Sequence, residues 1–203
     1  MIAFFRNHTF LLLFMLLFLT EGNTQENNWE LKKQQNGIQV YTRSIEGFKL
    51  EEFKGIIEID FSVKEIAALI KNVDSHPEWI KDCSKAELLK QTTDKMWVYS
   101  VTKAPFPVND RDGIALFSFH KIENALKIEL KGKADYLAPK KDLVRIPYLN
   151  GFWLLEKQSN QKTKVTYQIH ADPGGSVPAW LANATAVDMP FETLSNLRAY
   201  LNR

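Results

Sequence analysis

Apolar and polar residues alternate along much of the chain, with the period expected of β-strands that bury one face. Between residues 112 and 122 both faces are apolar, which indicates a strand covered on both sides. Asn-Gly pairs at residues 36–37 and 150–151 are typical of tight hairpin turns between strands. The strands predicted from these patterns are 29–33, 38–43, 48–60, 95–103, 112–122, 126–133, 144–149, 152–157 and 163–171.

Two segments have the 3.6-residue period of a helix instead. Ser62 and Glu65 have the spacing of a capping box, and an apolar stripe follows over residues 66–73. Apolar residues recur at helical spacing again from Val177 to Leu201, directly after Pro173-Gly174-Gly175. At ~1.5 Å per residue this terminal helix would be about 37 Å long, which is enough to cross a small domain.

The order of these elements predicts an α+β fold. Strands come in runs and the helices are segregated from them, which is typical of an antiparallel sheet with helices on one side. We expect a curved antiparallel sheet that grips the long C-terminal helix, with a cavity where the two do not meet. The sequence leaves open whether this helix is an ordinary structural cover or a lid over a ligand. The 203 residues show no internal repeat and no low-complexity linker, so one domain is expected.

The N-terminal residues have a different character from the rest. An unbroken apolar run from Phe10 to Leu19 follows Arg6 and precedes a polar stretch. Such a run is too short for a typical membrane span and is typical of a signal peptide. We therefore expect a signal peptide over residues 1–22 and a secreted or periplasmic domain over residues 23–203. The alternative is an uncleaved membrane anchor, which would also leave the folded part outside the cytoplasm.

Charge, cysteine content and motifs exclude several classes of function. The net charge is +2 and no long basic run occurs, which argues against nucleic acid as a partner. Cys83 is the only cysteine, so neither an intramolecular disulfide nor a cysteine-rich metal cluster can form. His76, His120 and His170 do not have metal-ligand spacing. The sequence contains no nucleophile elbow, no phosphate-binding glycine loop and no clear catalytic triad, so we expect no metal and no cofactor.

Residues 105–112, with the sequence Pro-Phe-Pro-Val-Asn-Asp-Arg-Asp, carry a resemblance to a known family. Together with Gly37–Tyr41, Trp79 and Trp180-Leu181, they make the chain similar to the START lipid-transfer domains, which have the helix-grip fold. The resemblance covers nearly all of residues 23–203, and Arg111-Asp112 is its most specific part. It implies that the C-terminal helix covers a tunnel for one lipid or other hydrophobic molecule, which is bound without chemical change.

The resemblance also bears on the ligand. Some family members place a charged residue in the tunnel, on the strands that flank the Arg-Asp motif. The corresponding stretches here, Trp97–Tyr99 and Leu116–Phe119, are uncharged, which favours an apolar ligand with a single hydroxyl or carbonyl. Arg111 and Asp112 are interpreted as structural, because buried charges are usually paired. The residues expected to line the cavity are Trp97, Tyr99, Phe117, Phe119, Trp153, Tyr167, His170, Trp180, Leu181, Ala184 and Val187.

These features favour a non-enzymatic carrier or sensor of a lipid or other hydrophobic small molecule, with transient membrane contact. The alternative is an enzyme on the same scaffold, a cyclase or hydrolase that acts on a hydrophobic substrate with His120 or His170 as its base. A third hypothesis is a binding module for another protein, with no occupied cavity. The sequence leaves the ligand, the oligomeric state and the choice between transport and sensing open.

Overall fold

The computed structural model describes residues 28–203 except residue 49, and for residues 179–184 it describes the backbone alone. The signal peptide expected at residues 1–22 lies outside the described residues. Ten strands form one sheet in the order β1-β2-β3-β10-β9-β7-β6-β5-β4, and the short β8 pairs with β6. The strands are β1 (Glu30–Gln35), β2 (Ile38–Arg43), β3 (Glu52–Ile59), β4 (Cys83–Gln91), β5 (Lys95–Thr102), β6 (Arg111–Ile122), β7 (Ala125–Gly132), β8 (Val144–Arg145), β9 (Tyr148–Ser159) and β10 (Lys162–Asp172).

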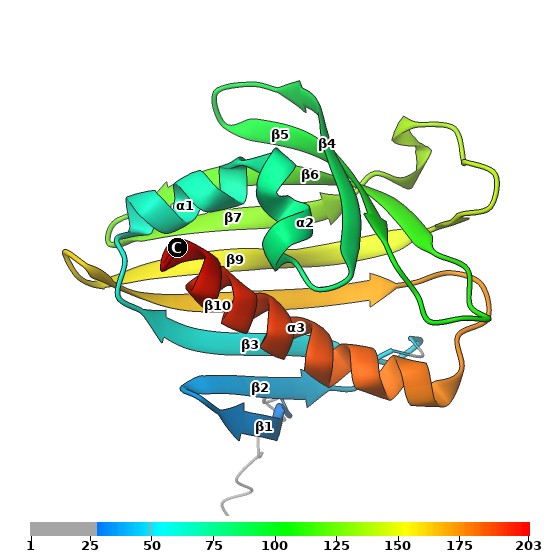
Figure 1. Ribbon diagram of the computed structural model, residues 1–203, viewed down its shortest axis with the longest axis horizontal. Coiled ribbons are helices and arrows are strands. Elements are labelled where there is room, and N and C mark those ends of the chain that lie inside the picture. Colours follow the sequence, from blue (N-terminus) through cyan, green and yellow to red (C-terminus); the bar gives the residue numbers. More distant parts are fainter. Residues whose placement is uncertain (1–27, 49) are drawn as a thin grey trace, which may run out of the picture.

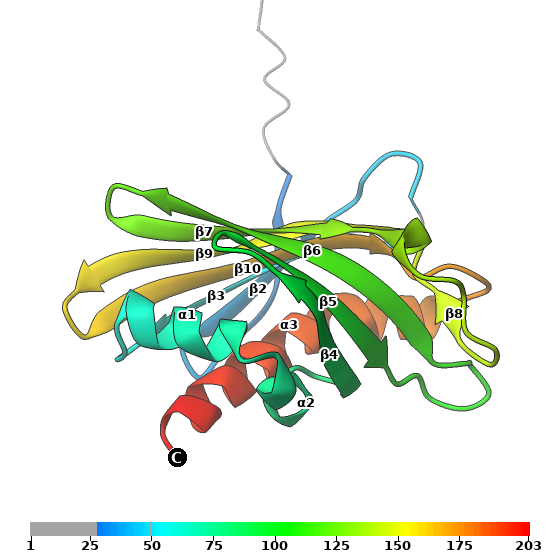
Figure 2. The same ribbon diagram turned by 90° about the horizontal axis from the view of Figure 1, so that it is seen from above.

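The three α-helices lie together on one side of this sheet. Figure 2 shows the sheet curving around them, and Figure 1 shows the C-terminal helix crossing β2 and β3. The α-helices are α1 (Val63–Lys71), α2 (His76–Trp79) and α3 (Ala179–Leu201), and short 3-10 helices form at η1 (Val73–Ser75) and η2 (Ala134–Tyr136). The expected α+β fold, a curved antiparallel sheet that grips a long C-terminal helix, is confirmed.

Two local signals in the sequence form the structures that they predict. Asn36 and Gly37 have φ angles of 53° and 75°, and they join β1 to β2 in a tight turn that needs positive φ at both positions. Ser62 caps α1, because its Oγ accepts a hydrogen bond from the Glu65 amide at 3.3 Å while Glu65 Oε2 accepts one from the Ser62 amide at 2.9 Å. Both signals act over a few residues and need no distant partner.

The prediction of a hairpin turn at Asn150-Gly151 is wrong. β9 continues through these residues from Tyr148 to Ser159, and Gly151 pairs with Ile169 of β10 and Leu130 of β7. A Cβ atom at position 151 would lie 2.2 Å from the carbonyl oxygen of Gln168, a distance that no side chain tolerates. The glycine therefore permits a close approach between two central strands rather than a turn.

β4 is a strand that the alternation of apolar and polar residues does not predict. It lies at the edge of the sheet, and most of its residues are exposed or only half-buried. Its pairing with β5 shifts register twice, between Cys83 and Lys85 and between Leu88 and Lys90. Each irregularity interrupts the period of two, so the sequence of this segment lacks the regular pattern of a half-buried strand.

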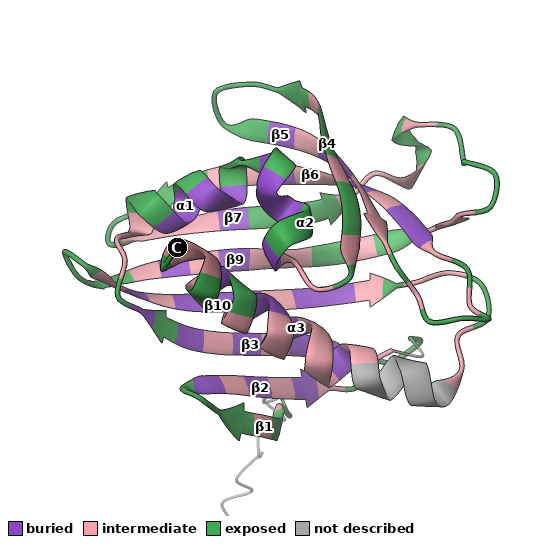
Figure 3. Ribbon diagram, viewed as in Figure 1, coloured by how far each residue is buried: buried purple, intermediate pink, exposed green. Residues whose placement is uncertain are grey.

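The hydrophobic core fills the space between the sheet and the helices. Figure 3 shows buried residues along the central strands and on the faces of α1 and α2 that meet the sheet. α3 joins this core through Leu194 and Leu197, both fully buried. At Gly55 of β3 a Cβ atom would lie 2.7 Å from Leu194 Cδ1, so the absence of a side chain there lets α3 approach the sheet. The C-terminal half of α3 is thereby fixed over β2 and β3.

The other face of the sheet is covered near β5 and β6 by the segment 133–145. Arg145 holds this segment through a bidentate ion pair with Asp112 of β6, in which Nε and Nη2 each lie 2.9 Å from a carboxylate oxygen. Arg145 Nη1 also donates to the carbonyl oxygen of Leu137 at 2.8 Å. Asp112 is fully buried, and its pKa is lowered chiefly by hydrogen bonds from Arg145. The pair thus fastens a long connection to the start of β6.

Replacing Leu194 with Ala tests the anchor of α3. The change removes a fully buried side chain from the contact with β3 and is expected to lower the free energy of unfolding by ~2–5 kcal/mol. Urea unfolding followed by circular dichroism measures it. Asn196→Ala, on the exposed side of the same helix, is the control and should change stability by about 0.5 kcal/mol or less. Equal losses in both variants would show that α3 is not anchored at Leu194.

Replacing Asp112 with Asn tests the buried ion pair. The variant should lose roughly 3–5 kcal/mol of stability near pH 7, because Arg145 keeps its charge without a partner. The folded pKa of Asp112 lies below its unfolded value, so the wild-type pair contributes fully above about pH 4 and loses its contribution as the pH falls through the folded pKa. The difference between wild type and variant should therefore shrink in acid.

Urea unfolding at a series of pH values measures this difference. Glu58→Gln is the control, because it removes an exposed pair in which the Glu58 carboxylate lies 2.6 Å from Lys162 Nζ. Such a surface pair is worth about 1 kcal/mol or less. A stability difference between wild type and Asp112→Asn that stays constant into strong acid would contradict the assignment.

Candidate functional site

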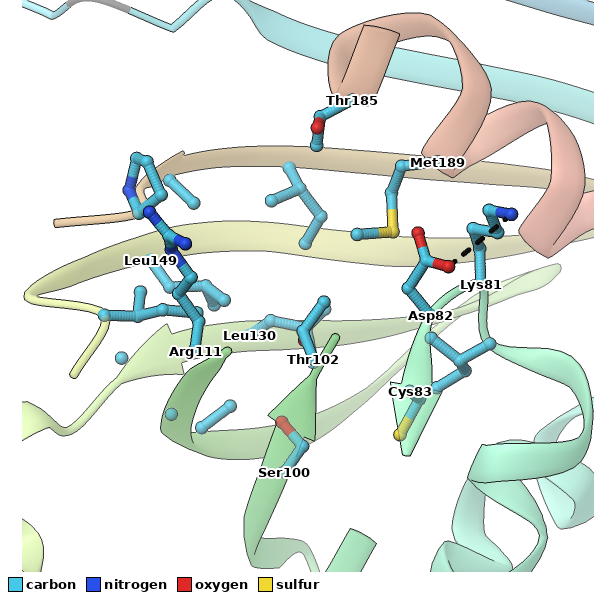
Figure 4. Close-up of a pocket in the computed structure, with 18 of the residues that line it drawn as sticks. Lys81, Asp82, Cys83, Ser100, Thr102, Arg111, Leu130, Leu149, Thr185 and Met189 are labelled. Carbon is cyan, nitrogen blue, oxygen red and sulfur yellow. Dashed lines mark ion pairs between the residues drawn. The ribbon is translucent and has the colours of Figure 1, made fainter. Parts of the chain in front are cut away.

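A cavity of about 270 Å³ lies between the concave face of the sheet and the N-terminal half of α3. Figure 4 shows the view into it, with side chains converging from β5, β6, β7, β9 and α3. Its apolar wall is built from strand residues that share the concave face and from α2. These residues include Phe53, Trp79, Ala115, Phe117, Trp153 and Tyr167.

Aromatic rings stack into a continuous floor for the cavity. Trp153 of β9 and Tyr167 of β10 are cross-strand partners, and their ring centroids lie 3.9 Å apart with an interplanar angle of 13°. Trp79 packs edge-on against Trp153 at 6.0 Å, and Phe53 packs edge-on against Tyr167 at 5.4 Å. Burial raises the pKa of Tyr167, so its hydroxyl stays neutral. Rings held in this way offer a rigid apolar surface to a ligand.

His76 adds a buried polar group to the cavity wall. Its Nε2 lies 2.8 Å from the carbonyl oxygen of Ile70, and its ring stacks at 6.3 Å from that of Phe117. Burial lowers the pKa of His76, so the ring is neutral and its Nε2 donates to Ile70. The imidazole is therefore committed to holding α2 against α1.

The mouth of the cavity is charged, in contrast to its floor. Lys81 Nζ lies 2.8 Å from a carboxylate oxygen of Glu192 on α3 and 3.5 Å from Asp82 Oδ1. The dashed line in Figure 4 marks the ion pair between Lys81 and Asp82. The backbone amide of Lys81 also donates to Thr193 Oγ1 at 3.2 Å. These contacts connect the segment after α2 to α3 beside the cavity.

Arg111 and Asp112 occupy opposite faces of β6 and have different surroundings. Asp112 pairs with Arg145 on the outer face, whereas Arg111 lines the cavity on the inner face and is 7% exposed. Arg111 donates to the carbonyl oxygen of Asn109, and no ion pair joins it to any carboxylate in the described part of the chain. The flanking stretches Trp97–Tyr99 and Leu116–Phe119 carry no charge, so the buried charge of the cavity wall comes from the Arg-Asp motif itself.

The residues expected to line the cavity divide into three groups. Phe117, Trp153 and Tyr167 do line it. The side chains of Trp180, Leu181 and Ala184 lie outside the described part of the structure. The structure places the remaining residues elsewhere, and these are Trp97, Tyr99, Phe119, His170 and Val187.

Trp97 and Tyr99 were assigned to the wrong face of β5. Val98, Ser100 and Thr102 face the cavity, so their neighbours must point the other way. There Trp97 stacks on Tyr136 at 6.4 Å, and the Nζ of Lys140 lies 4.0 Å above the ring of Tyr99. Both faces of β5 are apolar because segment 133–145 covers the outer one, so alternation alone did not distinguish them.

His170 lies on the outer face of β10, because neighbouring residues of a strand point to opposite faces. Its neighbours Ile169 and Ala171 line the cavity, while its own ring contacts Phe48 at 4.2 Å and Tyr148 at 5.3 Å. Burial lowers the pKa of His170, and its Nε2 has no hydrogen-bond partner among the described residues. A buried histidine on this face cannot reach a ligand in the cavity.

Phe119 and Val187 lie just beyond the cavity. Phe119 shares a face of β6 with Phe117 but packs under Lys71 of α1, whose Nζ lies 4.5 Å from the centre of its ring. Val187 packs against the core, while Ala186 and its helical neighbours Thr185 and Met189 line the cavity. The strand and the helix were predicted correctly, but the cavity covers a different stretch of each element than expected.

Among the wall residues that sequence reasoning missed are His76, Trp79 and Arg111. Trp79 belongs to the hydrophobic core and is 1% exposed, but it also faces the cavity. Arg111 had a detectable signal, since an arginine at the start of an apolar strand needs a polar partner. His76 had none, because α2 is a single short turn whose orientation depends on tertiary contacts.

Two further features of the described residues bear on function. No group of three or more histidine, cysteine or acidic side chains in the described part is arranged to hold a metal ion. Among the described helices, none combines the length and the apolar character needed to cross a membrane.

Comparison with known proteins agrees with this architecture. The protein-family model for the START domain matches residues 13–203. The crystal structure of a STAR-related lipid transfer protein from Xanthomonas axonopodis is 38% identical with a TM-score of 0.81, and the match covers 86% of this chain and 99% of that one.

Two relatives known from their sequences also match most of the chain. An uncharacterized protein of Pseudomonas aeruginosa is 36% identical over 90% of this chain and 91% of its own length. The human phosphatidylcholine transfer protein is 25% identical over 78% of this chain and 77% of its own length. With a matching family model over almost the whole chain and the sheet-and-helix cavity described above, the chain belongs to the START domain family.

Proposed function

We propose that this protein binds a lipid or other hydrophobic small molecule in the cavity under α3 and acts as its carrier or sensor, without chemical change. The observation that carries the proposal is the aromatic floor of Trp79, Trp153 and Tyr167 within a cavity of about 270 Å³. Ligand sites of this kind are mostly apolar with a few placed polar groups. The names of the human and Xanthomonas relatives, both lipid-transfer proteins, support the same reading.

The positions of the histidines favour a carrier over a cyclase or hydrolase. His170 lies on the outer face of β10, and His120 is an exposed residue whose Nε2 lies 3.5 Å from Glu129 on the surface. His76 lines the cavity, but it is neutral and donates to the backbone of Ile70. A general base must lie within hydrogen-bond reach of its substrate, and the two histidines considered from the sequence do not.

An exposed loop beside the cavity supports transient contact with a membrane. Phe106 is 96% exposed in the connection between β5 and β6, and its neighbour Pro105 lines the cavity. Aromatic side chains partition favourably to the interface between lipid and water. A carrier that contacted a bilayer through this loop would bring the mouth of its cavity to the lipid.

We also propose that the protein acts outside the cytoplasm. The support is the apolar run from Phe10 to Leu19 and the polar residues after it. The mature chain is then expected to begin near residues 23–25 and to be recovered as a soluble protein. Intact-mass measurement of the protein purified from its own host tests this expectation. A chain that still carries Met1 and stays in the membrane fraction would contradict it.

Filling the cavity tests the binding function directly. Ala186 is 6% exposed and lines the cavity, so Ala186→Phe should place a ring where the ligand lies. We expect the variant to retain about a tenth or less of the lipid bound by wild type, because the ring and an acyl chain cannot share the space. Solvent extraction of the purified proteins followed by mass spectrometry measures the bound lipid.

Ala199→Phe is the matched control, since residue 199 lies on the exposed side of the same helix. It should retain the wild-type amount of lipid. Thermal unfolding of both variants checks that the fold is intact. A wild-type protein that yields no lipid and takes up none from vesicles would support the binding-module hypothesis instead.

A further inference from the structure

Arg111 is the most deeply buried of the charged side chains that line the cavity. It is 7% exposed, whereas Glu51, Lys81, Asp82 and Lys103 are half-buried or exposed. Figure 4 shows its side chain extending into the cavity from the start of β6. Guanidinium groups stay protonated in proteins, so a full positive charge faces an otherwise apolar space.

No carboxylate in the described part of the chain forms an ion pair with this charge. The guanidinium donates to the carbonyl of Asn109. Both oxygens of Asp112 are taken by Arg145 on the other face of the sheet. The charge of Asp110 acts on Arg111 without an ion pair between them, and Asp110 Oδ1 accepts a hydrogen bond from the Ala104 amide at 2.9 Å. Arg111 therefore has donors left over for a ligand.

A hydroxyl group stands beside the guanidinium. Thr102 of β5 is the cross-strand partner of Arg111 and also lines the cavity, so both side chains lie on the same face. Directly opposed residues of an antiparallel pair have Cβ atoms roughly 4.5–5.5 Å apart, close enough to contact one small group together. Ser100, two residues before Thr102 on the same face, adds another hydroxyl to this wall.

We propose, on the basis of the lipid-binding function proposed above, that Arg111 and Thr102 bind the oxyanion of an amphiphilic ligand whose apolar chain lies on the aromatic floor. The shared chemistry is a carboxylate or phosphate oxygen at the head of a hydrocarbon chain. It can come from a free fatty acid or from the phosphate of a two-chain phospholipid. Arginine suits both, because its planar fork of N–H donors matches the geometry of these oxyanions.

The cavity volume favours the fatty acid of these two sources. Pockets that enclose drug-sized ligands commonly have volumes of about 300–1,000 Å³, and the 270 Å³ found here lies just below that range. One hydrocarbon chain therefore suits the space better than two. The anion preference and the number of chains are measured separately below.

Two matched pairs of ligands test the proposal. One pair is palmitic acid and cetyl alcohol, and the other is dipalmitoyl phosphatidic acid and dipalmitoylglycerol. Each pair differs in charge but keeps its hydrocarbon chains. The affinity of each ligand is measured by displacement of a neutral fluorescent lipid from the wild-type protein, from Arg111→Met and from Lys121→Met. Lys121 is the control, because it is an exposed cation near the other end of β6 and does not line the cavity.

Wild type should bind the anionic member of at least one pair about tenfold to a hundredfold more tightly than the neutral member, as expected for a hydrogen bond to a charged group. Arg111→Met should lose this preference and keep its affinity for the neutral member. Lys121→Met should keep the preference. The pair that shows the preference identifies the source of the oxyanion.

Arg111→Met is also expected to fold, because methionine keeps an apolar side chain where the arginine stem packs. Thermal unfolding without ligand checks this, and Thr102→Val offers a second variant, in which the preference should weaken about threefold or more. Equal binding of charged and neutral ligands by wild type, or a preference that survives in Arg111→Met, would overturn the inference while leaving lipid binding intact. Failure of wild type to bind the fluorescent lipid or any of the four ligands would overturn the proposed function as well.

Discussion

The contact between the C-terminal half of α3 and β3 determines where the rest of the molecule can lie. Leu194 and Leu197 are fully buried, and the missing side chain at Gly55 lets the helix come close to the sheet. With this half fixed, the N-terminal half must extend over the concave face, where Ala186 and Met189 line the cavity rather than fill it. The cavity is therefore a consequence of a long helix that meets a curved sheet closely along only one of its halves.

Arg111 and Asp112 are adjacent in the sequence but have different roles in the structure. On a strand, neighbouring side chains point to opposite faces, so Asp112 and Arg111 cannot share one environment. Asp112 pairs with Arg145 and fastens the outer covering segment, while Arg111 faces inward without a carboxylate partner among the described residues. One short motif thus supplies both a structural anchor and a positive charge above the floor of Trp153 and Tyr167. The resulting cavity is polar at one end and apolar along the rest, which complements an amphiphile.

The two Asn-Gly pairs show that the same local sequence can adopt two different structures. At Asn36-Gly37 the backbone adopts the positive φ angles of a tight turn, and the hairpin forms as predicted. At Asn150-Gly151 the same dipeptide lies inside a long central strand, and Gly151 is needed because Gln168 and Ile169 of β10 pass too close for a Cβ atom. The sequence is identical at the two sites, and the difference comes from a strand that lies elsewhere in the chain.

By itself the sequence determined the fold class, the capping box at Ser62, the terminal helix and the family, because these follow from spacings and signals along the chain. Tertiary structure alone decided which face of β5 lines the cavity. Trp97 and Tyr99 look as suitable as Val98 in the sequence, but Tyr136 and Lys140 cover them on the outer side. The alternation of residues separates the two faces of a strand. It does not tell which segment, distant in the sequence, will pack against each face. The partner of each buried charge was decided in the same way.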